Sequence, residues 1–259
     1  MTTIYRYDRE RLEAVKADMV REFPLVLTVN GKELATLIAS PHELRFLVAG
    51  FLRMQGFVES ADDFLVLSVC NDLSAANVRI RGEVPERLTP TLTSGCGAGV
   101  TFNLPQACRA TGEARNRGMG TFAPEEISAL MNELARRAEL YKRHGGIHSA
   151  AAGDGKSLFL FAEDIGRHNT LDRIAGEALL KNIDLTGKML VTSGRISIEL
   201  VAKALRLGLS LIASRTSPTD LAVKMGNEAG ITLIGYVRGG RFNVYSHPER
   251  LRIDAPCGT

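Results

Sequence analysis

The feature that most constrains the fold is an alternation of apolar, strand-like runs with amphipathic, helix-like runs through the second half of the chain. Strands are predicted at residues 147–152, 157–162, 188–192, 209–213, 231–237 and 241–245. Helices are predicted at residues 124–141, 168–181, 196–207 and 218–229. Strands that alternate with helices favour an α/β sandwich in which helices pack on a sheet.

The first half has a different pattern and predicts a smaller α+β part. Residues 23–40 are predicted to form a β-hairpin, because Asn30-Gly31 is a strong two-residue turn signal between apolar runs. Two further strands are predicted at 63–70 and 76–81. The polar, glycine-bearing segment 111–121 is the best candidate for a linker, so we divide the chain into residues 1–115 and 116–259.

A helix is predicted to begin directly after the hairpin. Ser40 is a suitable N-cap, Pro41 suits the first helical position, and Glu43 completes a capping box. Apolar residues follow at helical spacing and predict one buried stripe: Leu44, Leu47, Val48, Phe51 and Leu52. Gly56 is placed to end this helix.

Composition restricts the classes of function. The chain has 259 residues, of which 45% are apolar and 24% charged, so it can bury a substantial core. The net charge of +3 is too small to indicate nucleic-acid binding. No apolar run is long enough to cross a bilayer, and the charged first residues do not resemble a signal peptide. We therefore expect a cytoplasmic protein.

Cys96 differs from the other cysteines in its surroundings, because Gly95 and Gly97 flank it and Gly99 follows. Glycines allow the backbone to bend and another molecule to approach the sulfur, as thiolate chemistry requires. The alternative is a cysteine that merely occupies a turn. Cys70 follows an apolar run and is typical of a structural cysteine.

Two polar segments lie where predicted strands give way to helices. The first contains Asp164 and His168, and the second contains Ser193 and Arg195. Ligands of α/β folds bind at such strand ends, and a hydroxyl, a guanidinium and helical N–H groups together suit a phosphate. The alternative is that these residues cap helices or face solvent.

A third basic segment lies near the C-terminus, where Arg238 and Arg241 flank Gly239-Gly240 between two predicted strands. The simpler interpretation is a hairpin turn with exposed charge. The other is a glycine turn whose N–H groups approach an anion while the arginines neutralise it.

Two other motifs do not predict a site. Gly153 to Ser157 resembles the end of a phosphate-binding loop, but the required first glycine is Ala150 and a strand follows, so a turn is expected. His148 suggests a zinc deaminase, but position 150 is alanine and no Pro-Cys-x-x-Cys follows. We predict no zinc site.

Taken together, these motifs resemble the FdhD family, the sulfur carriers required for formate dehydrogenase activity. The most specific matching runs are TSGCG, GGIHSAA, FAEDIGRHNTLDRIAGEAL and VTSGRISIELVAKALRLG, together with the segment from SRTSPTD to YVRGGRF. The matching runs cover most of the chain in the family's order.

The resemblance implies a cytidine-deaminase-like α/β sandwich that has lost its zinc. It also implies that a cysteine desulfurase passes persulfide sulfur to the carrier, which delivers it to the molybdenum of the bis-molybdopterin guanine dinucleotide cofactor for formate dehydrogenase. Cys96 matches the persulfide cysteine of the family. The cofactor-binding segment of the family matches Tyr236, Val237, Arg238, Gly239, Gly240 and Arg241. Asp164, His168, Ser193 and Arg195 are expected either to line the same pocket or to cap helices. A homodimer is expected as well.

One position departs from the family pattern. Many members carry a second cysteine three residues after the first, and this chain has Gly99 there. Cys96 must therefore carry sulfur alone, as a sulfurtransferase with one thiol. The alternative function is a chaperone that binds the molybdenum cofactor without carrying sulfur. A deaminase-like hydrolase is a weaker third possibility, because the zinc ligands are missing.

Overall fold

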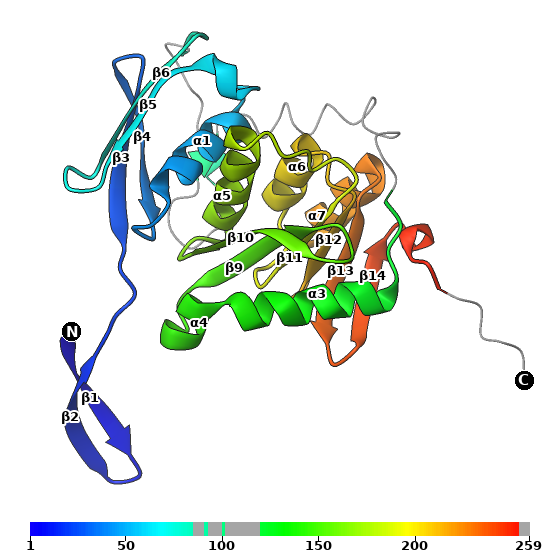
Figure 1. Cartoon of the computed structure of the whole chain (residues 1–259). Coiled ribbons are helices and arrows are strands. Elements are labelled where there is room, and N and C mark those ends of the chain that lie inside the picture. Colours follow the sequence, from blue (N-terminus) through cyan, green and yellow to red (C-terminus); the bar gives the residue numbers. More distant parts are fainter. Residues whose placement is uncertain (85–90, 93–99, 102–119, 254–259) are drawn as a thin grey trace, which may run out of the picture.

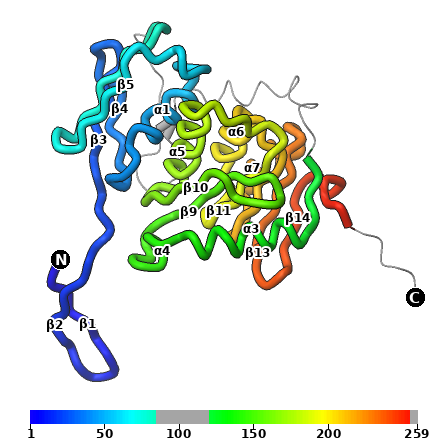
Figure 2. Tube along the Cα trace, viewed as in Figure 1, coloured from blue at the N-terminus to red at the C-terminus, as the bar shows by residue number. Residues whose placement is uncertain are grey.

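The computed structural model describes residues 1–84, 91–92, 100–101 and 120–253. Two main sheets lie in different halves of the chain, and a slender N-terminal hairpin extends away from both (Figures 1 and 2). The mixed α/β architecture predicted from the sequence is confirmed. The predicted boundary between residues 115 and 116 lies outside the described residues.

The larger sheet has six strands in the order β10-β9-β11-β12-β13-β14. The neighbours β11, β12 and β13 are parallel, whereas β9 runs antiparallel to both β10 and β11, and β14 runs antiparallel to β13. All six were predicted, with small shifts at their ends: β9 His148–Gly153, β10 Leu158–Asp164, β11 Met189–Thr192, β12 Leu211–Ser214, β13 Thr232–Arg238 and β14 Arg241–Ser246.

Helices cover both faces of this sheet (Figure 1). On one face lie α5 (Arg167–Leu180), α6 (Ile198–Arg206) and α7 (Asp220–Ala229), which pack on strand residues such as Leu190 and Ile212. On the other face α3 (Pro124–Arg137) packs on Val191 and Ala213. Because successive strand residues point to opposite faces, the continuously apolar strands supply both cores.

The predicted helix over 124–141 is interrupted. It continues after Ala138 as a separate short helix, α4 (Glu139–His144). The carboxylate of Glu163, at the end of β10, accepts hydrogen bonds from the backbone N–H groups of Leu140 and Tyr141 at 2.9 and 3.0 Å. The N–H groups at the start of α4 thus bind a carboxylate from the sheet, which the helical periodicity alone did not reveal.

The smaller sheet has the order β4-β3-β6-β5 and packs against α1 (Leu44–Gln55). The predicted hairpin is confirmed, and Asn30 and Gly31 both have positive φ, at 50° and 80°. This turn type matches the twist of the strands it joins. The strands are β3 Phe23–Val29, β4 Lys32–Ala39, β5 Phe64–Cys70 and β6 Ala75–Ile80.

The predicted start of α1 is wrong by three residues. The helix begins at Leu44, and Ser40 does not cap it. Instead the N–H of Ser40 donates to Asp164 at 3.1 Å, and its hydroxyl accepts a hydrogen bond from the N–H of Ile165. A distant loop therefore takes the polar groups that local capping would have used. The predicted end at Gly56, with φ of 82°, and the buried apolar stripe are confirmed.

Helices α1 and α5 cross with their backbones in contact. A Cβ on Gly50 would lie 1.6 Å from the carbonyl oxygen of Asp172, and a Cβ on Gly176 would lie 1.9 Å from that of Phe46. No side chain fits at either position. The two glycines therefore set how closely the smaller sheet and its helix approach the larger one.

The sequence analysis missed the N-terminal hairpin formed by β1 (Thr2–Asp8) and β2 (Arg11–Ala17). Its residues are mostly exposed and charged, so no apolar alternation signalled it. The remaining described elements are short: η1 Ala61–Asp63, β7 Thr91–Leu92, β8 Val100–Thr101 and η4 Pro248–Arg250. Within the described parts of the chain, no helix is both long and apolar enough to span a membrane.

The crossing of α1 and α5 yields a stability prediction. Gly176→Ala would improve helix propensity by about 1 kcal/mol, but the new methyl group overlaps the Phe46 carbonyl. We expect a net loss of about 3 kcal/mol or more in the free energy of unfolding, measured by urea denaturation. Gly82→Ala is the control, because its Cβ would lie 3.6 Å from the nearest atom. Equal stability of the two variants would contradict the assigned contact.

Candidate functional site

The polar segments predicted at strand ends meet along one edge of the larger sheet. Strands β10, β11 and β12 end at this edge, and α5, α6 and α7 begin just beyond them. The N-terminal end of β9 lies at the same edge, since His148 pairs with Asp164. We call this region the basic edge and define it by His148, Arg167, His168, Ser193, Gly194, Arg195, Arg215, Thr216, Tyr236 and Arg238.

Hydrogen bonds join the turns of the basic edge into one surface. The Ser193 hydroxyl accepts a hydrogen bond from the N–H of Ser149 at 3.0 Å. The Ser214 hydroxyl donates to the carbonyl of Gly194 at 2.7 Å. The N–H of Tyr236 donates to the carbonyl of Thr216 at 3.0 Å. Segments that lie far apart in the sequence are therefore held side by side.

The basic edge is rich in guanidinium groups. Arg195, Arg215 and Arg238 are exposed, and Arg167 is buried. The Arg238 guanidinium donates to the carbonyl of Arg215 at 3.3 Å, which draws two of the turns together. Guanidinium groups beside helix N-termini attract phosphate and carboxylate groups, so the arrangement suits an anionic ligand.

The segment Tyr236 to Arg241 is the turn between β13 and β14, as the simpler interpretation predicted. Gly239 and Gly240 have φ of 54° and 75°, and a Cβ on either would meet no atom within 4 Å. They are thus required for the turn and leave open space beside it. Tyr236 also has a positive φ, of 58°, and its side chain is exposed. Val237 differs from its neighbours, because its side chain is buried beneath α3.

A glycine also shapes the middle of the edge. A Cβ on Gly194 would lie 3.0 Å from Cβ of Arg167 and 3.5 Å from Nδ1 of His148. The Ser193-Gly194 turn therefore packs directly on these two cations. Burial lowers the pKa of His148, and the charge of Arg167 lowers it further. His148 is thus held neutral, able to accept or donate a hydrogen bond.

Asp164 has a structural role. It is fully buried, and its Oδ2 accepts hydrogen bonds from Nε and Nη2 of Arg173 at 2.9 and 2.6 Å. Its Oδ1 accepts from the N–H of Gly166 and the side chain of Asn169 at 2.9 and 2.8 Å. With Ser40 also bound, its oxygens are occupied. This supports the alternative in which Asp164 organises the start of α5.

His168 faces a buried cluster between α5 and α6. Its Nε2 lies 3.2 Å from both the Ser197 hydroxyl and Oε2 of Glu199. Lys203 lies 2.9 Å from Asp172 and 3.5 Å from the other Glu199 oxygen, and all three side chains are buried. Burial disfavours the charge of Lys203, but Asp172 and Glu199 outweigh it and raise the pKa.

Cys96, the predicted reactive cysteine, lies outside the described residues, as do Gly99, Cys108 and Cys257. Cys70 is described as a partly buried free thiol on β5, in agreement with a structural cysteine. Sequence reasoning left His148 and Arg215 out of the predicted site. The available signal was their position, since each lies next to the end of a strand that borders the edge.

Comparisons with known proteins identify relatives over nearly the whole length. The profile of the FdhD/NarQ family matches residues 20–252. A sulfur carrier protein FdhD from Bacillus subtilis (strain 168) is 36% identical over 255 residues, which cover 96% of each chain. The protein of that name from Staphylococcus aureus (strain MRSA252) is 35% identical over 252 residues, covering 96% of this chain and 94% of the relative.

The fold is similar to that of a solved structure. The crystal structure of a candidate formate dehydrogenase accessory protein from Desulfotalea psychrophila superimposes with a TM-score of 0.80 at 23% identity. The match covers 97% of this chain and 98% of the other. The chain therefore shares this fold, and the profile and sequence matches show that it belongs to the FdhD/NarQ family.

The His168 cluster yields a pH prediction. Burial lowers the pKa of His168 to about 3, with Glu199 opposing the shift and Lys203 adding to it. The unfolded chain retains a pKa near 6.5. Between these values only the unfolded state binds the proton, so stability falls as the pH drops below 6.5.

We expect His168→Gln to lose less stability than the wild type between pH 7 and pH 4.5. The difference in slope should approach about 1 kcal/mol per pH unit in urea denaturation, because the variant cannot take up this proton. The contribution of other groups cancels in the comparison. Parallel pH profiles for the two proteins would show that His168 does not titrate in this way.

Proposed function

We propose that this FdhD/NarQ family member is a sulfur carrier that loads persulfide sulfur on Cys96 and delivers it to a guanine-containing molybdenum cofactor required by formate dehydrogenase. The observation that carries the proposal is the near full-length match to proteins named sulfur carrier protein FdhD. The basic edge supports it, since arginines beside helix N-termini suit a large phosphorylated cargo.

The sulfur transfer needs one thiol. The Cys96 thiolate attacks the outer sulfur of a persulfide on a cysteine desulfurase, the S–S bond of the donor breaks, and the donor cysteine leaves as a thiolate. The product is a persulfide on Cys96, with no net oxidation. Release of the outer sulfur as sulfide to the molybdenum cargo consumes two electrons from a thiol reductant and restores the Cys96 thiol.

The cargo-binding proposal concerns the turn between β13 and β14. Arg238 and Arg241 would neutralise the phosphates of the bis-molybdopterin guanine dinucleotide, while Gly239 and Gly240 leave room beside the backbone. Arg195 and Ser193 extend the same surface. Val237 would contribute through its backbone, because its side chain lies in the core.

The finer family properties remain proposals as well. They are a cytidine-deaminase-like sandwich without zinc, a homodimer and a cytoplasmic location. The helices on both faces of a mixed sheet support the first of these.

A second candidate is a chaperone that holds the cofactor without carrying sulfur. Gly99, which stands where many members have a second cysteine, favours it. The two candidates differ in their need for the Cys96 thiol. Activation of formate dehydrogenase by a Cys96→Ala variant would favour the chaperone.

The carrier proposal is tested by loading. The full chain is incubated with a cysteine desulfurase and cysteine, and its mass is measured before and after reduction. We expect a gain of one sulfur atom (about 32 Da) that a reductant removes, because the Cys96 thiolate accepts sulfane sulfur. Cys70→Ala is the matched control and should load like the wild type. Equal loading of Cys96→Ala would exclude Cys96 as the carrier.

The cargo-binding proposal is tested with guanosine diphosphate as a probe. Replacing Arg238 and Arg241 by alanine should weaken binding at least tenfold in a calorimetric titration, because two charged phosphate contacts are lost. The deficit should be largest at low salt, since salt screens exposed charges. Replacement of the exposed Arg143, which lies on α4, is the control. Unchanged affinity in the double variant would remove both arginines from the site.

A further inference from the structure

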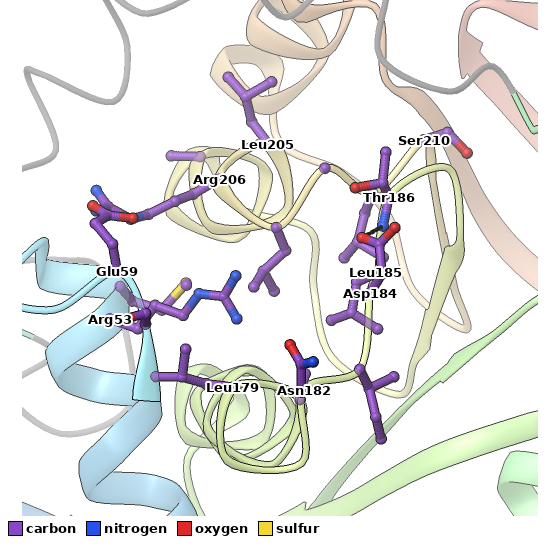
Figure 3. Close-up of a pocket in the computed structure, with 18 of the residues that line it drawn as sticks. Arg53, Glu59, Leu179, Asn182, Asp184, Leu185, Thr186, Leu205, Arg206 and Ser210 are labelled. Carbon is purple, nitrogen blue, oxygen red and sulfur yellow. Dashed lines mark hydrogen bonds and ion pairs between the residues drawn. The ribbon is translucent and has the colours of Figure 1, made fainter. Parts of the chain in front are cut away.

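A second region of the molecule has the features of a binding site. It is a cavity of about 1120 Å³ between α1, α5 and α6 (Figure 3). Leu185, Leu209 and Ile231 line it, and each lies within a few residues of the start of β11, β12 or β13. The basic edge lies beyond the opposite ends of these strands. The cavity is therefore separate from the proposed cargo site.

The inner part of the cavity contains an arginine that projects into it. Figure 3 shows the Arg53 side chain extending from α1 into the space between α5 and α6. Arg53 is half-buried, and no acceptor or carboxylate among the described residues lies within bonding distance of its guanidinium. Arg206 differs, because it forms an ion pair with Glu59. The protein thus holds one partly desolvated cation without a described partner.

The ends of the surrounding helices do not account for Arg53. Helices α1, α5 and α6 all end at this cavity, and carbonyl groups at helix C-termini often attract arginine. However, backbone N–H groups already satisfy the last turns. Phe57 donates to the carbonyl of Leu52 at 3.0 Å, Ile183 to Ala178 at 2.8 Å and Leu209 to Ala204 at 3.0 Å. The guanidinium of Arg53 is therefore available to another acceptor.

The walls and the mouth of the cavity differ in polarity. The side chains of Leu179, Leu185 and Leu205 form apolar walls. The acidic residues Glu59 and Asp184 lie at the exposed mouth. Glu59 is paired, and Asp184 accepts a hydrogen bond from the N–H of Thr186 at 2.9 Å. An apolar enclosure with one inward cation is typical of sites for small organic anions.

We propose that this cavity binds a small organic anion, a carboxylate or phosphate ester with an apolar body. Its oxygens accept hydrogen bonds from the Arg53 guanidinium, which presents paired N–H donors in the geometry that such groups match. The apolar body packs against the leucine walls. The Asn182 side chain at the mouth, exposed and without a described partner, adds a further donor.

The test is calorimetric titration of the full chain with four probes: benzoate, phenyl phosphate, benzamide and inorganic phosphate. We expect benzoate or phenyl phosphate to bind at least tenfold more tightly than benzamide, which lacks the charge, and than inorganic phosphate, which lacks the apolar body. The tighter of the two identifies the anion as a carboxylate or a phosphate ester. Absence of binding by both aromatic anions would overturn the proposal.

Variants place the probe in the cavity. Arg53→Met retains the helix and the apolar stem and should lose at least tenfold in affinity. Arg45→Met, on an exposed part of the same helix, should bind like the wild type. Wild-type affinity in Arg53→Met would refute the assignment.

Two further variants cover misfolding and a wrong location. If Arg53→Met melts early, Asn182→Asp tests the mouth, where the added charge should weaken binding most at low salt. A salt-independent affinity equal to that of the wild type would contradict the site. Arg238→Ala with Arg241→Ala should leave probe binding unchanged. Loss of probe binding in that double variant would locate the probe at the basic edge and overturn the proposal.

Discussion

The buried ion pair between Asp164 and Arg173 connects the two halves of the molecule. Arg173, on α5, also donates to the carbonyl groups of Ser40 and His42 just before α1, so one side chain binds the end of the larger sheet and the segment that leaves the smaller one. Removing one partner of such a pair leaves an uncompensated buried charge, at a cost of about 3–5 kcal/mol. The relative position of the two sheets thus depends on one charged contact.

The close crossing of α1 and α5 depends on the same contact and reinforces it. Gly50 and Gly176 let the helices approach until backbone meets backbone, and Arg173 lies one turn from Gly176 on the same helix. Apolar packing is non-directional, but the ion pair and the glycines permit one register only. The start of α5, and with it the position of His168 at the basic edge, is thereby fixed relative to the smaller sheet.

The two ends of the larger sheet have different chemistry. At the ends of β11 and β12, polar turns and exposed arginines face solvent, as suits a large phosphorylated cargo. At the starts of the same strands, apolar walls surround one arginine, as suits a smaller ligand. The short strands place these surfaces on opposite sides of one rigid sheet, so both can be occupied at once.

The sequence by itself determined the alternation of strands and helices, the hairpin at Asn30-Gly31, the end of α1 at Gly56 and the family, because these depend on local patterns and specific motifs. It also located Ser193, Arg195 and Arg238 at turns. Only the tertiary structure decided that Ser40 binds Asp164 instead of capping α1, and that Glu163 starts a new helix at Glu139. Those choices depend on groups more than twenty residues away, whose proximity no local pattern encodes.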